Sequence, residues 1–201
     1  MIRKDRKEDT VMKSISVVIL SGGRSSRMGS PKASLKIAGI SFAEHLANQF
    51  SAADEILFSV RKEEDFPDVP VPHIPDVYPG CGPLAGIHSA LVHSSNSLVF
   101  VVACDMPFVN RTVAEELAGR YREGVDAVIT VAPDGRGYTV CGLFHKRMIP
   151  LLESQLESGD FRLRRLLDKC KCIEVREDTF ADHEKIFRNV NTPEDYREVI
   201  Q

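Results

Sequence analysis

The chain has 201 residues, enough for one sizeable hydrophobic core and short for two domains. Hydrophobic residues make up 43% and charged residues 27%, a balance that is typical of globular proteins and excludes extended disorder. The formal net charge of −3 argues against a general nucleic-acid binder, and the apolar stretches are much shorter than a membrane span. We therefore expect neither nucleic acid nor a membrane as a partner.

The first residues of the chain indicate where the domain begins, and the cysteines indicate its cellular compartment. Residues 1–13 mix both charge signs and lack the apolar region of a signal peptide, so we expect a flexible tail there and a single domain over 14–201. The five cysteines are odd in number and form no C-x-x-C pair. This usage fits reduced thiols better than a disulfide framework, which predicts a cytoplasmic protein.

Short apolar runs alternate along the chain with segments of helical period. This pattern is typical of a mostly parallel sheet with helices on both faces. The expected strands are 15–20, 55–60, 98–103, 127–131, 140–144 and 172–175. The expected helices lie around 42–50 and 83–91, and over 112–121, 146–156, 161–167 and 193–200. Thr192 is suited to cap the last helix, and the proline-rich stretch 67–75 is expected to be irregular.

The loop after the first expected strand, LSGGRSSRMGSPK over 20–32, is rich in glycine and in cations. Glycine lets the backbone approach a ligand, and exposed amides at a strand end favour phosphate. Arg24, Arg27 and Lys32 add positive charge. The glycine spacing matches neither the P-loop nor the dinucleotide-binding pattern. The loop is thus expected to bind an anion, the alternative being a solvated basic turn.

Two further segments point to the same kind of site. The stretch PDVYPGCGPLAGIHSAL over 75–91 is a glycine-rich turn into a helix that begins near Pro83. Amides there can hold an anion or the edge of a base, or the turn simply starts the helix. The buried strand in LVFVVACDMPFV leads to Asp105, at the carboxyl end where α/β proteins collect catalytic groups. Asp105 is therefore either a Mg²⁺ ligand beside a triphosphate or a cap of the turn before Pro107.

These segments resemble the signatures of nucleotidyltransferases, most of all the molybdenum cofactor guanylyltransferases. The first loop is similar to their L-[AS]-[AG]-G-x-x-x-R-M-x-x-x-K pattern, and the second segment to D-x-x-x-G-x-G-P-L-A-G. CDMP at 104–107 is similar to their C-D-x-P metal motif, and NVNTPEDY at 189–196 to a segment near their active site. The resemblance spans 15–196 and implies a single-domain, Rossmann-like three-layer α/β/α nucleotidyltransferase fold.

The resemblance also implies a set of site residues. It assigns catalysis to Arg27, Lys32 and Asp105, with the Mg²⁺ cofactor on Asp105. The nucleotide-binding residues that it implies are Leu20, Ser21, Gly22, Gly23, Lys32, Ser59, Asp76, Gly82, Pro83 and Leu84. Asp76 is expected on the base, because a carboxylate can accept from both N1–H and N2–H₂ of guanine. Ser59 stands where relatives often have asparagine, and Asn189 and Asn191 either complete the site or shape a turn.

The implied reaction transfers GMP from GTP to the terminal phosphate of molybdenum-molybdopterin and releases pyrophosphate. GTP and molybdenum-molybdopterin are the expected small-molecule partners, together with proteins that deliver or accept the molybdenum cofactor. The basic run at Arg162, Arg164, Arg165 and Lys169 either receives an acceptor phosphate or is a solvated helix face. Two alternatives stay open: a cytidylyltransferase acting on molybdopterin or another phosphorylated acceptor, and a nucleotide-binding regulatory module without catalysis.

Overall fold

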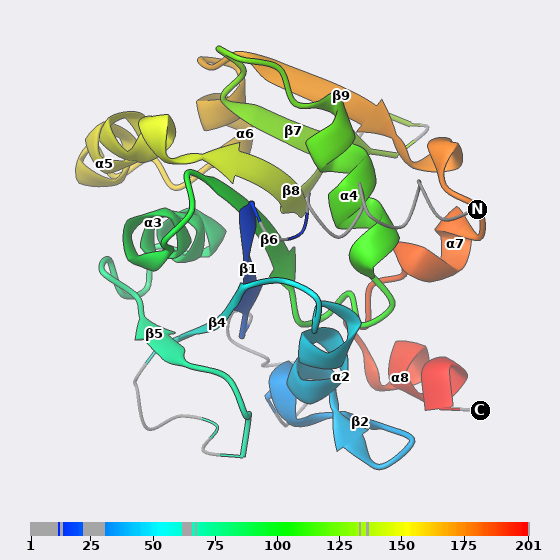
Figure 1. The fold of residues 1–201 in the computed structure, drawn as a ribbon. Helices are drawn as coiled ribbons and strands as arrows, with labels where there is room; N and C mark the ends of the chain where they lie inside the picture. The colour runs from blue at the N-terminus through cyan, green and yellow to red at the C-terminus, as the bar shows by residue number, and fades with distance from the viewer. Residues whose placement is uncertain are drawn as a thin grey trace.

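The computed structural model describes residues 12, 14–21, 31–61, 66, 68–132, 134–135 and 137–200, and its main feature is a seven-stranded sheet (Figure 1). The strand order is β5-β4-β1-β6-β8-β7-β9. Their bounds are β1 (Ile15–Leu20), β4 (Glu55–Val60), β5 (His73–Pro75), β6 (Leu98–Ala103), β7 (Ala127–Val131), β8 (Gly137–His145) and β9 (Cys172–Arg176). Neighbouring strands are parallel except at β8, which runs antiparallel to β6 and β7.

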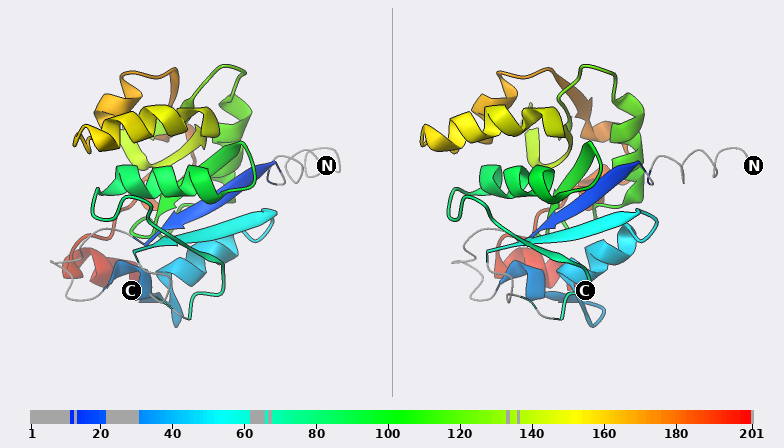
Figure 2. Two further views of the ribbon diagram at one scale, coloured as in Figure 1. Left: turned by 90° about the vertical axis from the view of Figure 1, so that its left-hand side faces the viewer. Right: turned by 60° about the vertical axis from the view of Figure 1, so that its left-hand side comes forward.

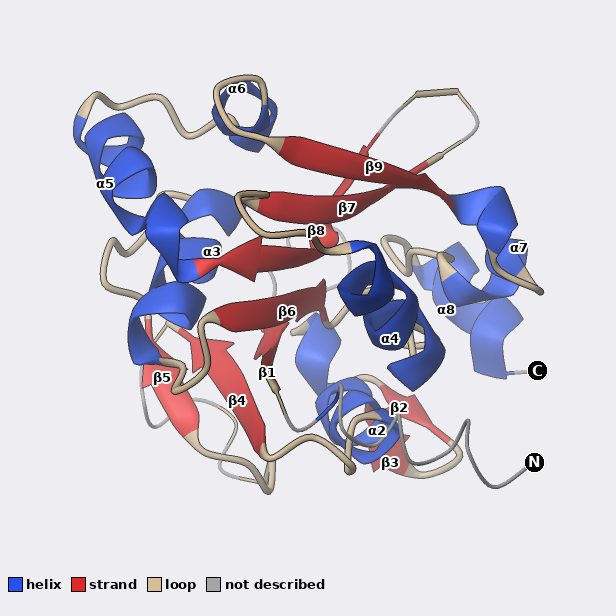
Figure 3. Cartoon of the chain, turned by 45° about the horizontal axis from the view of Figure 1, so that its top comes forward, coloured by secondary structure: helices blue, strands red, loops and turns tan. Residues whose placement is uncertain are grey.

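Helices cover both faces of this sheet, which gives three layers (Figures 1 and 3). One face carries α3 (Pro83–His93), α5 (Ile149–Glu157) and α6 (Leu163–Leu167). The other carries α2 (Phe42–Gln49) and α4 (Arg111–Arg120), with α7 (His183–Ile186) and α8 (Pro193–Ile200) beside them. Figure 2 shows α2 and α3 on opposite sides of β1 and β4. A small hairpin, β2 (Lys36–Ile37) and β3 (Ile40–Ser41), precedes α2.

The central strands are buried on both faces because helices pack on each side. In β1, Val17 and Ile19 join the core under α2 and α4, whereas Val18 and Leu20 join the core under α3 and α5. Two-sided burial explains why the strand is a continuous apolar run rather than an alternating one. The sequence pattern thus already indicates that β1 lies in the interior of the sheet.

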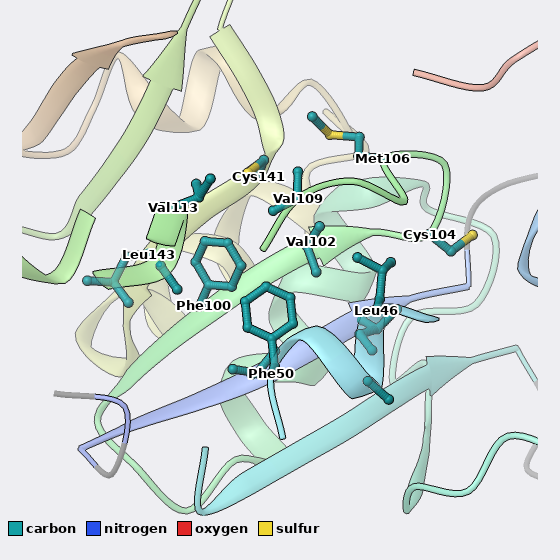
Figure 4. Packing of buried hydrophobic residues seen from close by; sticks show 14 of the residues in the cluster. Leu46, Phe50, Phe100, Val102, Cys104, Met106, Val109, Val113, Cys141 and Leu143 are labelled. Atoms are coloured by element: carbon teal, nitrogen blue, oxygen red, sulfur yellow. The ribbon is translucent and has the colours of Figure 1, made fainter. Parts of the chain in front are cut away.

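Aromatic rings fill the core between the sheet and α2. Phe50, at the end of α2, packs against Phe100 of β6 with ring centroids 5.4 Å apart (Figure 4). Cys104 and Met106 extend this core to the carboxyl end of β6. Met12, which falls within the expected tail, is buried in the same core. The other residues of 1–13 lie outside the described part of the chain.

The α/β fold class and the mostly parallel sheet predicted from the sequence are confirmed, and β1, β4, β6 and β7 have the expected bounds. The proline-rich stretch was expected to be irregular, but His73–Pro75 forms the edge strand β5. An edge position tolerates proline because no further strand needs its missing N–H. The division into a tail and one domain stays a prediction. No helix of the described residues is long and apolar enough to cross a membrane.

Candidate active site

The carboxyl ends of β5, β4, β1 and β6 meet at one edge of the sheet and border a cavity of about 530 Å³. Its described lining residues include Leu20, Ser21, Ser59, Arg61, Asp76, Pro79, Gly80, Gly82, Pro83, Gly86, Ala103, Asp105 and Val140. Because neighbouring strands are ~4.8 Å apart, the residues after β5 and β6 lie roughly 14 Å apart across three spacings. Seven of the predicted site residues therefore share one elongated cavity whose two ends differ in chemistry.

Asp105 lies at the β6 end of the cavity and is ion-paired. Lys32 donates from Nζ to Asp105 Oδ2 at 2.8 Å and to Asn191 Oδ1 at 2.5 Å. The Lys32 and Asp105 side chains are only 14% and 19% exposed. Partial burial reduces solvent screening of this pair, although it also carries a desolvation cost. Three predicted residues from distant parts of the chain thus meet at this end of the cavity.

A backbone hydrogen bond fixes the C-terminal segment to the site. Val190 donates its N–H to the carbonyl oxygen of Asp105 at 2.8 Å, which places Asn191 beside Lys32. The α8 start is then capped as predicted: Asp195 accepts from the Thr192 N–H at 2.8 Å and donates its own N–H to Thr192 Oγ1 at 3.1 Å. Asn191 is therefore brought to the site by a cap and a β6 contact together.

The short hairpin that follows η1 (Lys32–Ser34) is held by α8. The Tyr196 hydroxyl donates to the carbonyl oxygen of Lys36 at 2.8 Å and accepts from the Lys36 N–H at 3.2 Å. The Tyr196 ring also packs edge-on against Phe42, with centroids 6.0 Å apart. The last helix thus braces the segment that carries the site lysine.

The Asp105 carboxylate fits a Mg²⁺ ligand on its own geometry. Its Oδ1 atom is buried and has no hydrogen-bond partner among the described residues, whereas Oδ2 faces Lys32. A buried carboxylate oxygen without a donor is costly unless something binds it. Mg²⁺ needs only one or two protein carboxylates when phosphate oxygens and water complete its shell. A single aspartate oxygen at this position suits that cation.

Asp76 lies at the opposite end of the cavity, directly after β5. Its N–H donates to the carbonyl oxygen of Val60 at 3.1 Å, which continues the β4–β5 pairing. Ser59 is buried and donates its hydroxyl to Asp76 Oδ1 at 3.1 Å. Within the described residues no donor contacts Asp76 Oδ2. The carboxylate is therefore oriented by Ser59 and keeps acceptor capacity for a ligand.

Burial raises the pKa of the Asp76 carboxyl above its ordinary value. The hydrogen bond from Ser59 and the positive charge of Arg61 both lower this pKa and offset part of the rise. Asp76 is therefore a carboxylate whose charge depends on its immediate neighbours.

Close packing between β1 and α3 shapes the wall of the cavity. A Cβ atom on Gly86 of α3 would lie 3.2 Å from Leu20 Cδ1, so a larger residue there would require the Leu20 side chain to shift. Gly82 caps α3 with a φ of 69°, a left-handed conformation that favours glycine, and Pro83 takes the first helical position. Leu84, a predicted nucleotide-binding residue, is fully buried in the core under α3.

Several residues predicted for the site either fall outside the described part of the chain or make no contact with the site. Gly22, Gly23, Arg24 and Arg27 fall outside the described residues, so their predicted roles stay predictions. The side chain of Asn189 makes no hydrogen bond with any described residue of the site. The basic run is ion-paired: Arg162 and Arg165 contact Asp160, and Arg164 contacts Asp168 and Glu174.

Arg61 was not among the predicted site residues, although it lines the cavity. Its only sequence signal is its place directly after the β4 strand, and many exposed arginines follow strands. Only the β4–β5 pairing, which brings Arg61 opposite Asp76, reveals its relation to the site.

Comparisons with known proteins agree with this geometry. Residues 17–175 match the family described as the MobA-like NTP transferase domain, and the chain belongs to this family. A probable molybdenum cofactor guanylyltransferase of Geobacillus sp. (strain WCH70) is 34% identical over 94% of this chain and 100% of its own length. The molybdenum cofactor guanylyltransferase of Vibrio atlanticus (strain LGP32) is 35% identical over 89% of this chain and 91% of its own.

Solved structures show the same fold. Molybdopterin-guanine dinucleotide biosynthesis protein A from Archaeoglobus fulgidus has a TM-score of 0.79 and 26% identity, over 92% of this chain and 96% of its own. The 2-C-methyl-D-erythritol 4-phosphate cytidylyltransferase from Thermus thermophilus has a TM-score of 0.64 and 17% identity, over 90% of this chain and 95% of its own. At that identity the second likeness concerns the fold alone. The family confirms the resemblance found in the sequence, and with it the nucleotidyltransferase class of enzyme.

Proposed function

We propose that this protein transfers GMP from GTP to the terminal phosphate of molybdenum-molybdopterin and releases pyrophosphate. The observation that carries the proposal is the single cavity with the Asp76 carboxylate at one end and Asp105, which is ion-paired with Lys32, at the other. The relatives named as molybdenum cofactor guanylyltransferases, 34–35% identical over most of the chain, support it. Its location in the cytoplasm, and partners that deliver or accept the cofactor, belong to the same proposal.

At the β6 end, the chain's own residues handle charge. Donor and acceptor are both anionic phosphates, so their approach is opposed until positive charge is supplied. Lys32 would exchange its contact with Asp105 for the phosphate oxygens of GTP, and Asn191 would steady its ammonium group. Asp105 would hold Mg²⁺, which when bound neutralises phosphate charge and polarises the phosphorus under attack. Arg27 is proposed to assist Lys32.

The acceptor needs no general base from the protein. A phosphate monoester is largely ionised near neutral pH, so its oxygen is already a nucleophile. The nearest thiol is also unsuited to covalent catalysis, because burial and the charge of Asp105 raise the pKa of Cys104. The site therefore works by orientation and electrostatics, with direct transfer between the two phosphates as the proposed step.

The test of this proposal compares nucleotides on the intact protein. Thermal stabilisation is measured with GTP, CTP, ATP and UTP, each with Mg²⁺, followed by pyrophosphate release with molybdenum-molybdopterin as acceptor. We expect a stabilisation selective for GTP and turnover only with GTP. A CTP-selective shift would replace the proposal by a cytidylyltransferase, and GTP binding without turnover would favour a regulatory module.

A further inference from the structure

We propose that Arg61 binds the O6 and N7 acceptors of guanine while Asp76 binds the N1–H and N2–H₂ donors of the same base. The inference rests on the proposed function, because it assumes that the base of GTP lies at the β4–β5 end of the cavity. It assigns Arg61 a specificity role, which the family resemblance does not supply for this position.

The sheet register places the two side chains next to each other. Val60 is the partner of Pro75 in the parallel β4–β5 pair, so the next residues, Arg61 and Asp76, leave adjacent strands at the same level. Arg61 follows the last residue of β4 directly and lies two positions after Ser59. Ser59 donates a hydrogen bond to Asp76, and all three residues line the same cavity. Arg61 therefore extends the surface that already orients the carboxylate.

Arg61 is exposed, lines the cavity and interacts electrostatically with Asp76. It forms no hydrogen bond or salt bridge with any described residue, so its guanidinium group is not committed to a structural role in that part of the chain. By contrast, the arginines of the basic run are all paired with carboxylates. A guanidinium held beside a ligand cavity can present its planar donors to a ligand.

The chemistry of the pair selects among bases. Arginine binds the O6 and N7 acceptors of guanine in a bidentate way, and a carboxylate accepts from donors such as those on N1 and N2. Guanine presents two adjacent donors beside two adjacent acceptors. Cytosine and adenine each present only one amino donor and leave a carboxylate–arginine pair partly unmatched. A cation and a carboxylate on neighbouring strands, ~4.8 Å apart, therefore fit two neighbouring edges of a guanine ring.

Arg61 lies away from the Lys32–Asp105 pair. Lys32 and Asp105 mark the phosphate end after β6, which is two strand spacings from β4, or roughly 10 Å. Asp76, in contrast, is on the adjacent strand. The position of Arg61 therefore favours the base over phosphates held at the Lys32–Asp105 pair, and the tripolyphosphate measurement below separates a base contact from a contact with phosphates at the loop after β1.

The experiment removes one recognition atom of the ligand at a time. Dissociation constants are measured by calorimetry for GTP, 7-deaza-GTP, which lacks N7, and inosine triphosphate, which lacks the N2 amino group. We expect the wild-type protein to bind GTP about tenfold more tightly than 7-deaza-GTP. Arg61→Met should bind these two nucleotides equally but still prefer GTP over inosine triphosphate. Arg61→Lys should behave like Arg61→Met, since an ammonium group cannot make the bidentate contact.

Asp76→Asn is the matched control, because it changes the other half of the pair. It should abolish the preference for GTP over inosine triphosphate and keep the preference over 7-deaza-GTP. Equal affinity of the wild-type protein for GTP and 7-deaza-GTP would overturn the inference. So would an Arg61→Met variant that loses affinity for GTP, CTP and inorganic tripolyphosphate alike, because that result indicates a phosphate contact.

The proposed function and this inference fail in different ways. A wild-type protein that shows no preference for GTP over CTP contradicts the proposed function, whatever the variants do. A wild-type protein that prefers GTP and discriminates against inosine triphosphate, but not against 7-deaza-GTP, leaves the proposed function standing and removes only the role of Arg61.

Discussion

The two aspartates of the cavity differ in how they are held, and the difference separates recognition from chemistry. Asp76 accepts a hydrogen bond from a neutral hydroxyl, and burial raises the pKa of its carboxyl. Asp105 faces an ammonium group and has a buried oxygen without a partner among the described residues. A neutral partner leaves a carboxylate free to accept from a base. A cationic partner offsets the negative charge of a carboxylate that lies where phosphates would approach.

Among the changes proposed here, Asp105→Asn should have the largest effect, because it alters the end of the cavity where the transfer reaction is proposed to occur. We expect Mg²⁺-dependent turnover to fall by about a hundredfold or more, because the metal loses its charged ligand. The selectivity for GTP over inosine triphosphate should not change. Turnover is followed by pyrophosphate release, and thermal melting checks the fold.

Asp54→Asn is the control for Asp105→Asn, since Asp54 is exposed at the opposite, amino end of β4. It should keep wild-type turnover. Substantial Mg²⁺-dependent turnover of Asp105→Asn would remove Asp105 from the metal role and make the two aspartates more alike than we propose.

Lys32→Met should weaken the binding of GTP at the same end of the cavity, with a smaller effect than that of Asp105→Asn on turnover. Hydrogen bonds to charged groups contribute about 1.5–3 kcal/mol, so we expect the Kd for GTP to rise at least about tenfold. The ratio of affinities for GTP and inosine triphosphate should stay constant, because Asp76 still reads the base. The exposed Lys36 offers a matched control in Lys36→Met. If Lys32→Met binds GTP as tightly as the wild type, Lys32 does not contact the triphosphate.

Acidification should have the smallest effect, a loss of affinity for GTP at the Asp76 end of the cavity. The raised pKa of Asp76 means that the carboxyl takes up a proton at a higher pH than an ordinary aspartate would. A protonated carboxyl accepts poorly from N1–H and N2–H₂, so the affinity for GTP should fall on acidification, and the fall should begin at a higher pH than for an ordinary aspartate. Calorimetric titrations with GTP test this, and Asp76→Asn should show a flatter profile.

The raised pKa of Asp76 affects the free energy of unfolding in the opposite direction, because acidification stabilises the folded state. The native state binds this proton more readily than the unfolded chain does, so the contribution to the free energy of unfolding is fully present below the ordinary aspartate pKa. It is lost as the pH rises through the folded-state pKa. An affinity for GTP that is constant across this pH range would show that Asp76 does not bind the base in its ionised form.

Local signals in the sequence predicted most of the fold. Two-sided burial makes β1 and β6 continuous apolar runs, and the cap at Thr192 marks the start of α8, so these elements are visible without coordinates. The edge strand β5 was not predicted because its pairing is set by β4, and the prolines in and before it are typical of an irregular connection. Pairing between distant segments is not a local property of the chain.

The residues of the site that lie in motifs were also predictable from the sequence, whereas the contacts between them were not. Lys32, Asp76 and Asp105 were identified through motifs, and the structure brings them to one cavity. Their contacts with Ser59 and Asn191 have no signal in spacing alone, since they depend on which strands are neighbours. Arg61 has no motif at all, and only the register of β4 against β5 connects it to Asp76.

The contact between Lys32 and Asn191 joins positions 159 residues apart, which has a consequence for synthesis. A chain emerging from the ribosome completes β1, β4 and β6 long before the segment after Val190 is available. Until then nothing from α8 braces the lysine, and a partly made chain has a sheet without a finished site. Activity should therefore appear only once the segment after Val190 and α8 have been made. A chain truncated before Val190 should bind nucleotide poorly even where the sheet has formed.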